Sequence, residues 1–369
     1  MGSTKPDSTQ RAATASHRNL DLVRAIAVLI VVARHLVLYY DVPERPWFQH
    51  WPFGTAGVAI FFVHTSLVLM FSLDRQSDGR RPVYGSFLLR RIFRIYPLSV
   101  LAVVATVFIF RVADPGTLDW GVVLANLGLV QNLVGVPSVL TPLWSLPLEM
   151  QMYLVLPFLF LLVKRRGWPV MAFVLLPISI LLAGLEHFLK GLPTFIPYAP
   201  CFVVGVLSYS IWDRVRPRLP WQAVPATIVA GVLVYMLTYH WLHWQALLAI
   251  PMCLALGLLL PFCRDLPEGR LSRAAKRVAT YSYGIYLFHE VYLRLFARLL
   301  ADRIPSLRLG PTTDPWVWLP VGLALAATAL TSFALYHLVE RPFMRAGARI
   351  ASRWRAEPAY APPDISKAA

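Results

Sequence analysis

The sequence predicts an all-α polytopic membrane protein, a single bundle of about ten transmembrane helices plus a short re-entrant or interfacial helix. Hydrophobic residues make up 57% of the 369-residue chain and charged residues only 15%, whereas about a quarter of a soluble protein is charged. Many apolar runs reach the roughly 20 residues needed to cross about 30 Å of hydrocarbon. The length favours one compact bundle over a set of soluble domains.

Ten apolar segments qualify as spans: residues 20–40, 54–73, 95–111, 142–163, 169–188, 196–212, 222–241, 245–263, 279–300 and 316–339. An eleventh run, 120–133, is short, and loop charge decides whether it crosses. If it does not cross, 26 of the 35 Lys and Arg residues lie on one side of the membrane and five on the other. If it does, Lys164–Arg166 move to the outer side and the bias is lost.

The positive-inside rule therefore predicts a multi-pass protein of the cytoplasmic (inner) membrane with both termini cytoplasmic. The same bias accounts for the net charge of +16 without a nucleic-acid partner. Residues 1–18 are expected to form a disordered cytoplasmic tail, 19–343 the transmembrane domain, and 344–369 a basic and then Pro/Ala-rich cytoplasmic tail. The three cysteines have no motif spacing, so we expect buried small side chains and no metal site.

Apart from Asp21 and Glu186, which lie within two residues of a span end, only two carboxylates, Glu149 and Glu290, fall inside the predicted spans. Ionisable groups there are costly and usually functional. Glu290 has a local explanation in Arg294, four residues further along the same helix. Glu149 needs a partner from another helix, and His35 lies at a similar predicted depth. A carboxylate that orients an imidazole is an arrangement suited to general-base catalysis.

The first span also carries Arg24, eleven residues before His35. At about 100° per residue the two side chains share one helix face, separated by roughly 16 Å. One face thus offers a cation near the cytoplasm and a titratable base near the outer side. Arg34 points about 100° away and is expected to brace another helix. The structural alternative is that Arg24 snorkels to the headgroups and His35 is a hydrogen-bonded core histidine.

Arg90, Arg91 and Arg94 lie at the cytoplasmic start of the third span. Guanidinium groups bind phosphates bidentately, so the cluster is a candidate phosphate site. The alternative is a positive-inside anchor that contacts lipid phosphates.

Six segments together resemble the acyltransferase 3 family of bacterial integral-membrane O-acyltransferases. Arg24 and His35 match its "R, ten residues, H" signature, and "RRIFRIYP" matches R-x-x-R at Arg91 and Arg94. The other four are "GVAIFFVHTSLVLMFSL", "WSLPLEMQMYLVLP", "SYGIYLFH" and "ERP". Together they cover residues 20–343 in the family's order. One departure is His64 with Thr65, where the family usually has Leu-Ser; it places an extra imidazole at mid-membrane.

The resemblance implies transfer of an acyl group, most often acetyl, from cytoplasmic acyl-coenzyme A as donor substrate, with no bound cofactor. Arg91 and Arg94 would hold the donor phosphates, with Arg24 just inside. His35 would act as general base oriented by Glu149, or as the carrier in an acyl-histidine relay. The remaining candidates lie on the acceptor or oxyanion side: Trp144, Ser145, Tyr153, Tyr283, Tyr286 and His289.

The acceptor implied first is a hydroxyl of a surface glycan or lipid-linked sugar, because His35 and Trp144 lie toward the outer side. The alternative acceptor is a small molecule such as a macrolide. A second functional class is a glycolipid exporter without acyl transfer, whose in-membrane charges would line a path. A sensor or scaffold is a third class.

Overall fold

The computed structural model describes residues 18–39, 50–77, 84–110, 119–189, 195–242, 245–301 and 318–356. Each of the ten predicted spans corresponds to helix within these ranges: α2 (Arg18–Tyr39), α3 (His50–Gln76), α4 (Tyr84–Phe110), α6 (Ser145–Arg166), α8 (Leu176–Leu189), α9 (Ala199–Trp212), α10 (Ala223–Leu242), α11 (Gln245–Leu259), α12 (Arg270–Ala301) and α13 (Trp318–Leu335). The described residues contain one isolated β-bridge, between Leu219 and Cys263, and no longer strand.

Short helical segments connect or extend these rods: α5 (Trp120–Leu127), η2 (Thr141–Trp144), α7 (Trp168–Val170), η3 (Met171–Leu175), η4 (Ile196–Tyr198), η5 (Leu260–Phe262), η8 (Tyr336–Glu340) and α14 (Arg341–Ala356). The last one extends the predicted final span. Through the π-helical turn η8 the chain continues as α14, which packs along α4. The first part of the predicted C-terminal tail is thus helical, and residues 357–369 lie outside the described residues.

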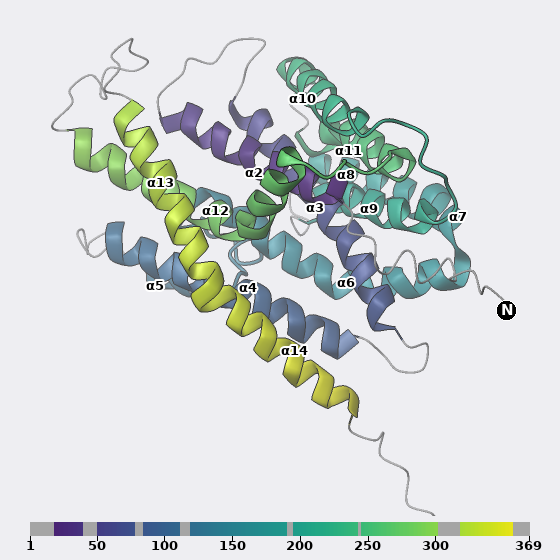
Figure 1. Cartoon of the computed structure of the whole chain (residues 1–369), viewed down its shortest axis with the longest axis horizontal. Helices are drawn as coiled ribbons and strands as arrows, with labels where there is room; N and C mark the ends of the chain where they lie inside the picture. Colours follow the sequence, from purple (N-terminus) through teal and green to yellow (C-terminus); the bar gives the residue numbers. More distant parts are fainter. Residues whose placement is uncertain are drawn as a thin grey trace, which may run out of the picture.

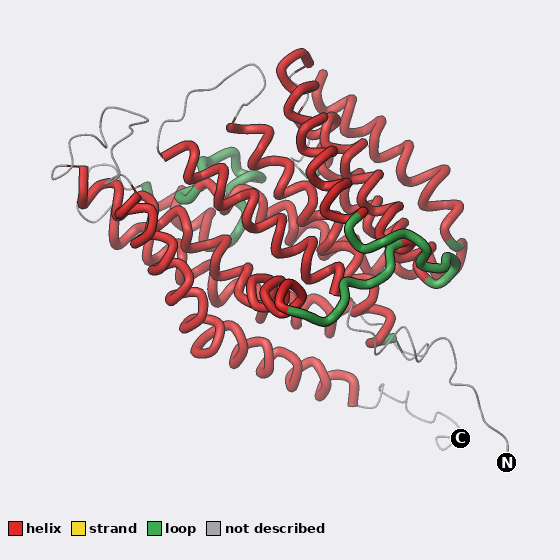
Figure 2. The backbone as a smooth tube through the Cα atoms, turned by 45° about the horizontal axis from the view of Figure 1, so that its top comes forward, coloured by secondary structure: helices red, strands yellow, loops and turns green. Residues whose placement is uncertain are grey.

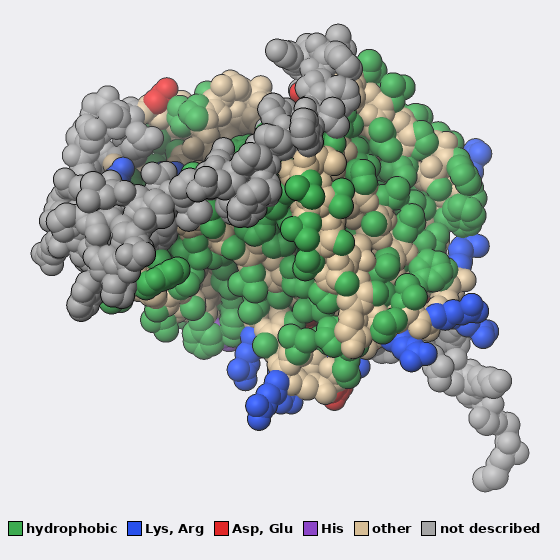
Figure 3. All heavy atoms as spheres, turned by 90° about the horizontal axis from the view of Figure 1, so that it is seen from above, with side chains coloured by type: hydrophobic (Ala, Val, Ile, Leu, Met, Phe, Trp, Pro, Cys, Tyr) green, Lys and Arg blue, Asp and Glu red, His purple; other side chains and the backbone are tan. Residues whose placement is uncertain are grey.

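Five helical segments of the described chain are long and apolar enough to cross a membrane: Trp51–Gln76, Tyr84–Phe110, Thr141–Arg166, Trp168–Glu186 and Trp318–Arg353. Three shorter apolar helices accompany them. Figure 3 shows a face covered largely by hydrophobic side chains, with most visible Lys and Arg toward its right and lower edges. The structure is that of an all-α membrane protein.

The central helix is α3, whose most apolar window is 78% buried, against 22% for Trp168–Glu186 at the periphery. It packs against α2 and α9, while α2 also packs along α12 (Figures 1 and 2). Gly57 permits the close approach of α2 to α3, because a Cβ there would lie 2.9 Å from the Ala27 carbonyl oxygen. The two helices that carry most candidate residues, α2 and α12, are thus held against the centre of the bundle.

The predicted short helix at 120–133 is α5, eight residues long. It spans about 12 Å and cannot cross a membrane. It runs beside α4, and the Tyr96 hydroxyl donates to the Gly128 carbonyl at 3.0 Å (Figure 1). Because Tyr96 lies 14 residues before the end of α4, the chain has turned back into the bundle at Gly128. The segment folds back beside α4, and the loop that follows it leads to η2.

One buried amide holds this re-entrant segment together. Asn126 donates to the Val122 carbonyl at 2.8 Å and to the Pro137 carbonyl at 3.0 Å, and its Oδ1 accepts from Val139 N at 3.1 Å. Its side chain is fully buried. The loop that follows α5 is therefore fixed ahead of η2.

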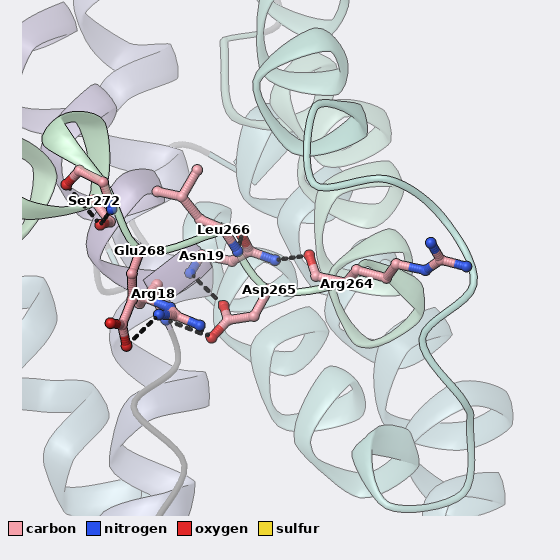
Figure 4. A network of polar contacts seen from close by, with 8 residues as sticks. Arg18, Asn19, Arg264, Asp265, Leu266, Glu268 and Ser272 are labelled. Carbon is pink, nitrogen blue, oxygen red and sulfur yellow. Dashed lines mark hydrogen bonds and ion pairs between the residues drawn. The ribbon is translucent and has the colours of Figure 1, made fainter.

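The start of α2 is fixed in turn by the loop that precedes α12 (Figure 4). The Asp265 carboxylate accepts from the backbone N–H groups of Arg18 and Asn19 at 3.2 and 2.9 Å. The Asn19 side chain donates to the Arg264 carbonyl at 3.0 Å and accepts from Leu266 N at 3.0 Å. These contacts satisfy orphan N–H groups of the helix end. They also set the height of α2 relative to α12.

We expect Asn126→Ala to lower the thermal unfolding temperature of the purified protein by several degrees. Each buried partner left unpaired costs about 1–3 kcal/mol. The matched control is Ser138→Ala, which removes only a 3.4 Å contact with Gln131. Equal unfolding temperatures for both variants would contradict the role given to Asn126.

Candidate active site

Three adjoining cavities run through the bundle, named here for the predicted cytoplasmic and outer sides. The inner cavity, about 370 Å³, is lined by Leu20, Asp21, Arg24, His64, Val68, Phe71, Arg75, Arg94, Ala279, Thr280 and Tyr336. The middle cavity, about 50 Å³, is lined by Arg24, Val58, Phe61, Phe62, Thr65, Arg94, Ile95, Ser145, Leu146, Glu149, Ser282, Tyr283 and Tyr286. The outer cavity, about 20 Å³, is lined by Val31, Arg34, His35, Trp51, Gly54, Thr55, Val58, Thr141, Pro142, Trp144 and Tyr286.

Shared walls place the cavities in a row. Arg24 and Arg94 line both the inner and the middle cavity. Val58 and Tyr286 line both the middle and the outer cavity. The row therefore leads from a basic chamber near the start of α2 to His35 near its other end.

His35 is held by its own helix and by α12. Its Nδ1 lies 2.9 Å from the Val31 carbonyl oxygen and 3.1 Å from Nε2 of His289. A carbonyl can only accept, so the proton is assigned to His35 Nδ1. The same argument assigns a proton to Nδ1 of His289, which lies 2.9 Å from the Ile285 carbonyl. The lone pair on His289 Nε2 then faces the proton of His35.

This tautomer leaves Nε2 of His35 as a bare lone pair. That atom is buried and has no hydrogen-bond partner among the residues that the structure describes. The ring lines the outer cavity together with Trp51 and Trp144. An oriented imidazole with an unoccupied basic nitrogen in a cavity is what a general base requires.

Arg34 and Trp51 form one wall of the outer cavity. The guanidinium carbon lies 5.5 Å from the centre of the Trp51 ring. The aliphatic part of Arg34 lies against Gly54, where a Cβ would come within 2.7 Å of Arg34 Cγ. The prediction that Arg34 braces a neighbouring helix is confirmed, because both contacts are on α3.

The predicted hydrogen bond between His35 and Glu149 is wrong. Among the described residues His35 pairs with His289, and Glu149 accepts a short hydrogen bond from the Tyr153 hydroxyl on its own helix. Glu149 instead lines the middle cavity with Arg24 and Arg94. Similar depth did not bring the two side chains together, because α12 supplies the partner of His35.

Arg24 and Arg94, the two arginines shared by the inner and middle cavities, are anchored by polar partners. Arg24 Nε donates to Ser282 Oγ on α12 at 2.6 Å. Arg94 lies 3.5 Å from the carboxylate of Glu340, whose side chain is 1% exposed. Glu340 belongs to the "ERP" segment, so the structure explains that motif as the counter-ion of Arg94. The guanidinium groups are held with their faces toward the cavities.

Arg91 lies close enough to Tyr153, Glu149 and Arg94 to interact with them electrostatically, but it does not reach the cavity walls. It lines none of these three cavities, and its guanidinium carbon lies 5.6 Å from the ring centre of Phe87 on the same helix. Of the two arginines in the R-x-x-R motif, the structure brings only Arg94 to the cavity wall.

The tyrosines of α12 that were predicted for the oxyanion side already donate their hydroxyl protons to backbone carbonyl groups. Tyr283 donates to the Ile95 carbonyl at 2.8 Å, and Tyr286 donates to the Pro142 carbonyl at 2.7 Å. Ser145 lies 2.7 Å from the Tyr286 hydroxyl and can donate to it. These contacts join α12 to α4, η2 and α6 around the middle cavity.

The second in-span carboxylate has the predicted local partner. Glu290 lies 2.5 Å from Arg294 on the same helix and accepts from Thr141 at 2.9 Å. The pair fixes η2 against α12, which is a structural role. No group of three His, Cys, Asp or Glu side chains among the described residues is placed to hold a metal ion.

Comparison with known proteins identifies the family of the chain. The model of an acyltransferase domain, that of the acyltransferase 3 family, matches residues 17–337. The chain belongs to the acyltransferase 3 family. It is therefore a membrane acyltransferase that transfers groups other than aminoacyl groups.

Two of the three similar curated proteins described next carry acyltransferase names, and the third is named as a nodulation protein. The acyltransferase MdmB of Streptomyces mycarofaciens is 26% identical over 322 residues, which cover 79% of this chain and 81% of that protein. The peptidoglycan O-acetyltransferase OatA of Listeria monocytogenes is 25% identical over 371 residues, which cover 89% of this chain but only 56% of that protein. Nodulation protein 10 of Rhizobium leguminosarum is 25% identical over 379 residues, which cover 92% and 97%. No solved structure matches the chain.

In this acyltransferase the sequence predicted neither the partner of His35 nor which cavity His64 lines. His289 pairs with His35, and His64 lines the inner cavity. The first had a signal in "SYGIYLFH", whose histidine was assigned to the oxyanion side. The second was noted as a departure, but its cavity could not be known before α3 was placed.

We expect His289→Leu to lower turnover about 10-fold or more by releasing the ring of His35, with little change in the KM for the donor. His289→Gln, whose side-chain carbonyl can accept from His35 Nδ1, should restore part of the rate. Turnover and thermal unfolding are measured for both variants. Identical turnover in the two, at equal unfolding temperature, would contradict a positioning role.

Proposed function

We propose that this acyltransferase moves an acyl group, acetyl in the first instance, from cytoplasmic acyl-coenzyme A to a hydroxyl of a surface glycan or lipid-linked sugar. The observation that carries the proposal is the row of cavities between the guanidinium groups of Arg24 and Arg94 and Nε2 of His35. Guanidinium groups suit donor phosphates, and a free imidazole nitrogen suits a hydroxyl proton.

The proposed orientation is ten spans in the cytoplasmic membrane with both termini inside. The inner cavity then opens toward the side that holds 26 of the 35 Lys and Arg residues. An anionic donor made in the cytoplasm meets positive charge there. The outer cavity, with His35 and Trp144, faces the acceptor.

The chemical step balances without a further reactant. His35 Nε2 takes the proton of the acceptor hydroxyl while its oxygen attacks the thioester carbonyl carbon. The carbon–sulfur bond breaks, and the imidazolium returns the proton to the leaving thiolate. The products are an ester and free coenzyme A. Glu149 balances the charge of the two arginines beside the thioester.

The size of the outer cavity supports a large acceptor that presents one hydroxyl. A cavity needs about 10–15 Å³ to hold a water, and the outer cavity holds about 20 Å³. One hydroxyl-sized group reaches His35, while the rest of the acceptor stays beyond Trp51, which is 40% exposed. A relative named as a peptidoglycan O-acetyltransferase supports the same acceptor class.

The proposal is tested by incubating purified protein in detergent with labelled acetyl-coenzyme A and glycan fragments. We expect a labelled ester. An exporter without acyl transfer forms no covalent product. The absence of a labelled ester with every acceptor class would therefore overturn the proposal. A labelled ester only on small hydrophobic metabolites would overturn the acceptor assignment and retain the chemistry.

We expect His35→Ala to reduce ester formation by about 10²- to 10⁴-fold, the usual contribution of a general base. Protein yield and unfolding temperature should stay close to those of the unmodified chain. Wild-type turnover in this variant would leave His35 a structural residue.

We expect Arg94→Ala to raise the KM for the donor about 10-fold or more, because charge-assisted hydrogen bonds contribute about 1.5–3 kcal/mol. Arg91→Ala should change it less, since Arg91 packs on Phe87 outside the cavities. Glu340→Gln is the matched control, which breaks the ion pair but keeps the guanidinium. A larger effect from Arg91 than from Arg94 would contradict this donor path.

A further inference from the structure

One stripe of α3 forms a continuous wall of the inner cavity. Its members are His64, Val68, Phe71 and Arg75, and their spacing of four, three and four residues keeps them on one helix face. From His64 to Arg75 the stripe is roughly 16 Å long. It is apolar in the middle and polar at both ends, and none of the four is among the predicted catalytic, donor-binding or acceptor-side residues.

The deep, mid-membrane end of the stripe is an imidazole with one unsatisfied nitrogen. His64 is 4% exposed, and its Nδ1 has no hydrogen-bond partner among the residues described. A buried polar atom without a partner costs about 1–3 kcal/mol, and such atoms are uncommon in folded proteins. Because the ring lines a cavity of about 370 Å³, a ligand has room to supply the missing partner.

The cytoplasmic end of the stripe is a cation. Arg75 is exposed, and it makes no ion pair with the part of the chain that the structure describes. The cavity contains two further arginines, Arg24 and Arg94, and one carboxylate, Asp21. Its lining is therefore net positive, which favours an anionic ligand over a neutral or cationic one.

We propose that this stripe binds the phosphopantetheine arm of the acyl donor. Arg75 binds a phosphate at the cavity mouth, Val68 and Phe71 pack along the carbon chain, and His64 hydrogen-bonds an amide of the arm. The inference rests on acyl-coenzyme A as donor and adds the residues that recognise its arm. An arm held in this way presents its thioester to the middle cavity, where Arg24 and Glu149 lie.

The two ends of this site can be tested separately by calorimetric titration of the purified full chain in detergent with three ligands. Coenzyme A carries both arm and phosphates, pantetheine carries the arm alone, and adenosine 3′,5′-bisphosphate carries phosphates alone. His64→Leu should weaken coenzyme A and pantetheine about tenfold and leave the bisphosphate unchanged. Arg75→Gln should weaken coenzyme A and the bisphosphate and leave pantetheine unchanged.

Two control variants test whether the changes in affinity are specific to the stripe. Arg165→Gln removes an exposed arginine that lines none of the three cavities, so its affinities should equal those of the unmodified chain. His64→Gln keeps a hydrogen-bonding group and should bind pantetheine more tightly than His64→Leu. Unfolding temperatures show whether each variant is folded.

The possible failures are distinguishable. If the unmodified chain forms ester and binds coenzyme A, but His64→Leu and Arg75→Gln bind it equally well, the stripe is overturned and the proposed function stands. If His64→Leu weakens all three ligands alike, the assignment of His64 to the arm is overturned. If the unmodified chain binds none of the three and forms no ester, the donor itself is wrong, and the inference fails with it.

Discussion

The pairing of α2 with α12 is the contact on which the site depends. The two helices meet at three heights: Asn19 with the loop before α12, Arg24 with Ser282, and His35 with His289. The Asn19 contact fixes the position of α2 along α12, because both the NH2 group and the carbonyl oxygen of the Asn19 side-chain amide are hydrogen-bonded. A shift of one helical turn, about 5.4 Å, would break the histidine pair and move Arg24 away from the cavities. The Asn19 contact thus helps to fix the position of His35 from 16 residues away on the same helix, a distance of roughly 24 Å.

Buried charge is the second constraint, because cations inside a membrane are costly unless they are paired or lie beside water. The structure meets this cost differently for each arginine: Arg94 has the carboxylate of Glu340, and Arg24 has Ser282 with Glu149 across the middle cavity. Each keeps part of its guanidinium toward a cavity wall. The pairs therefore hold the cations in place and leave them able to bind an anionic ligand.

Much of the fold follows from composition and loop charge, since hydropathy marks the helical segments and the lysine–arginine bias identifies 120–133 as a segment that does not cross. Helical periodicity also places Arg24 and His35 on one face. Hydropathy and periodicity do not predict which helices lie side by side. Glu149 has the right depth for His35, but α12 is the neighbour of α2, so His289 is the partner. Arg91 and Arg94 differ by three residues, and packing of α14 on α4 decides which one reaches the cavity.

A second imidazole as the partner of the base has a physical consequence. A carboxylate at that position would place a permanent charge in the membrane interior, whereas His289 is neutral and adds none. It fixes the ring and the tautomer of His35, but it stabilises the imidazolium less than an anion would. In the proposed mechanism His35 would therefore hold the acceptor proton only until the leaving thiolate takes it. The proposed step thus removes and returns the proton through one nitrogen, Nε2 of His35, which faces a cavity large enough for one hydroxyl.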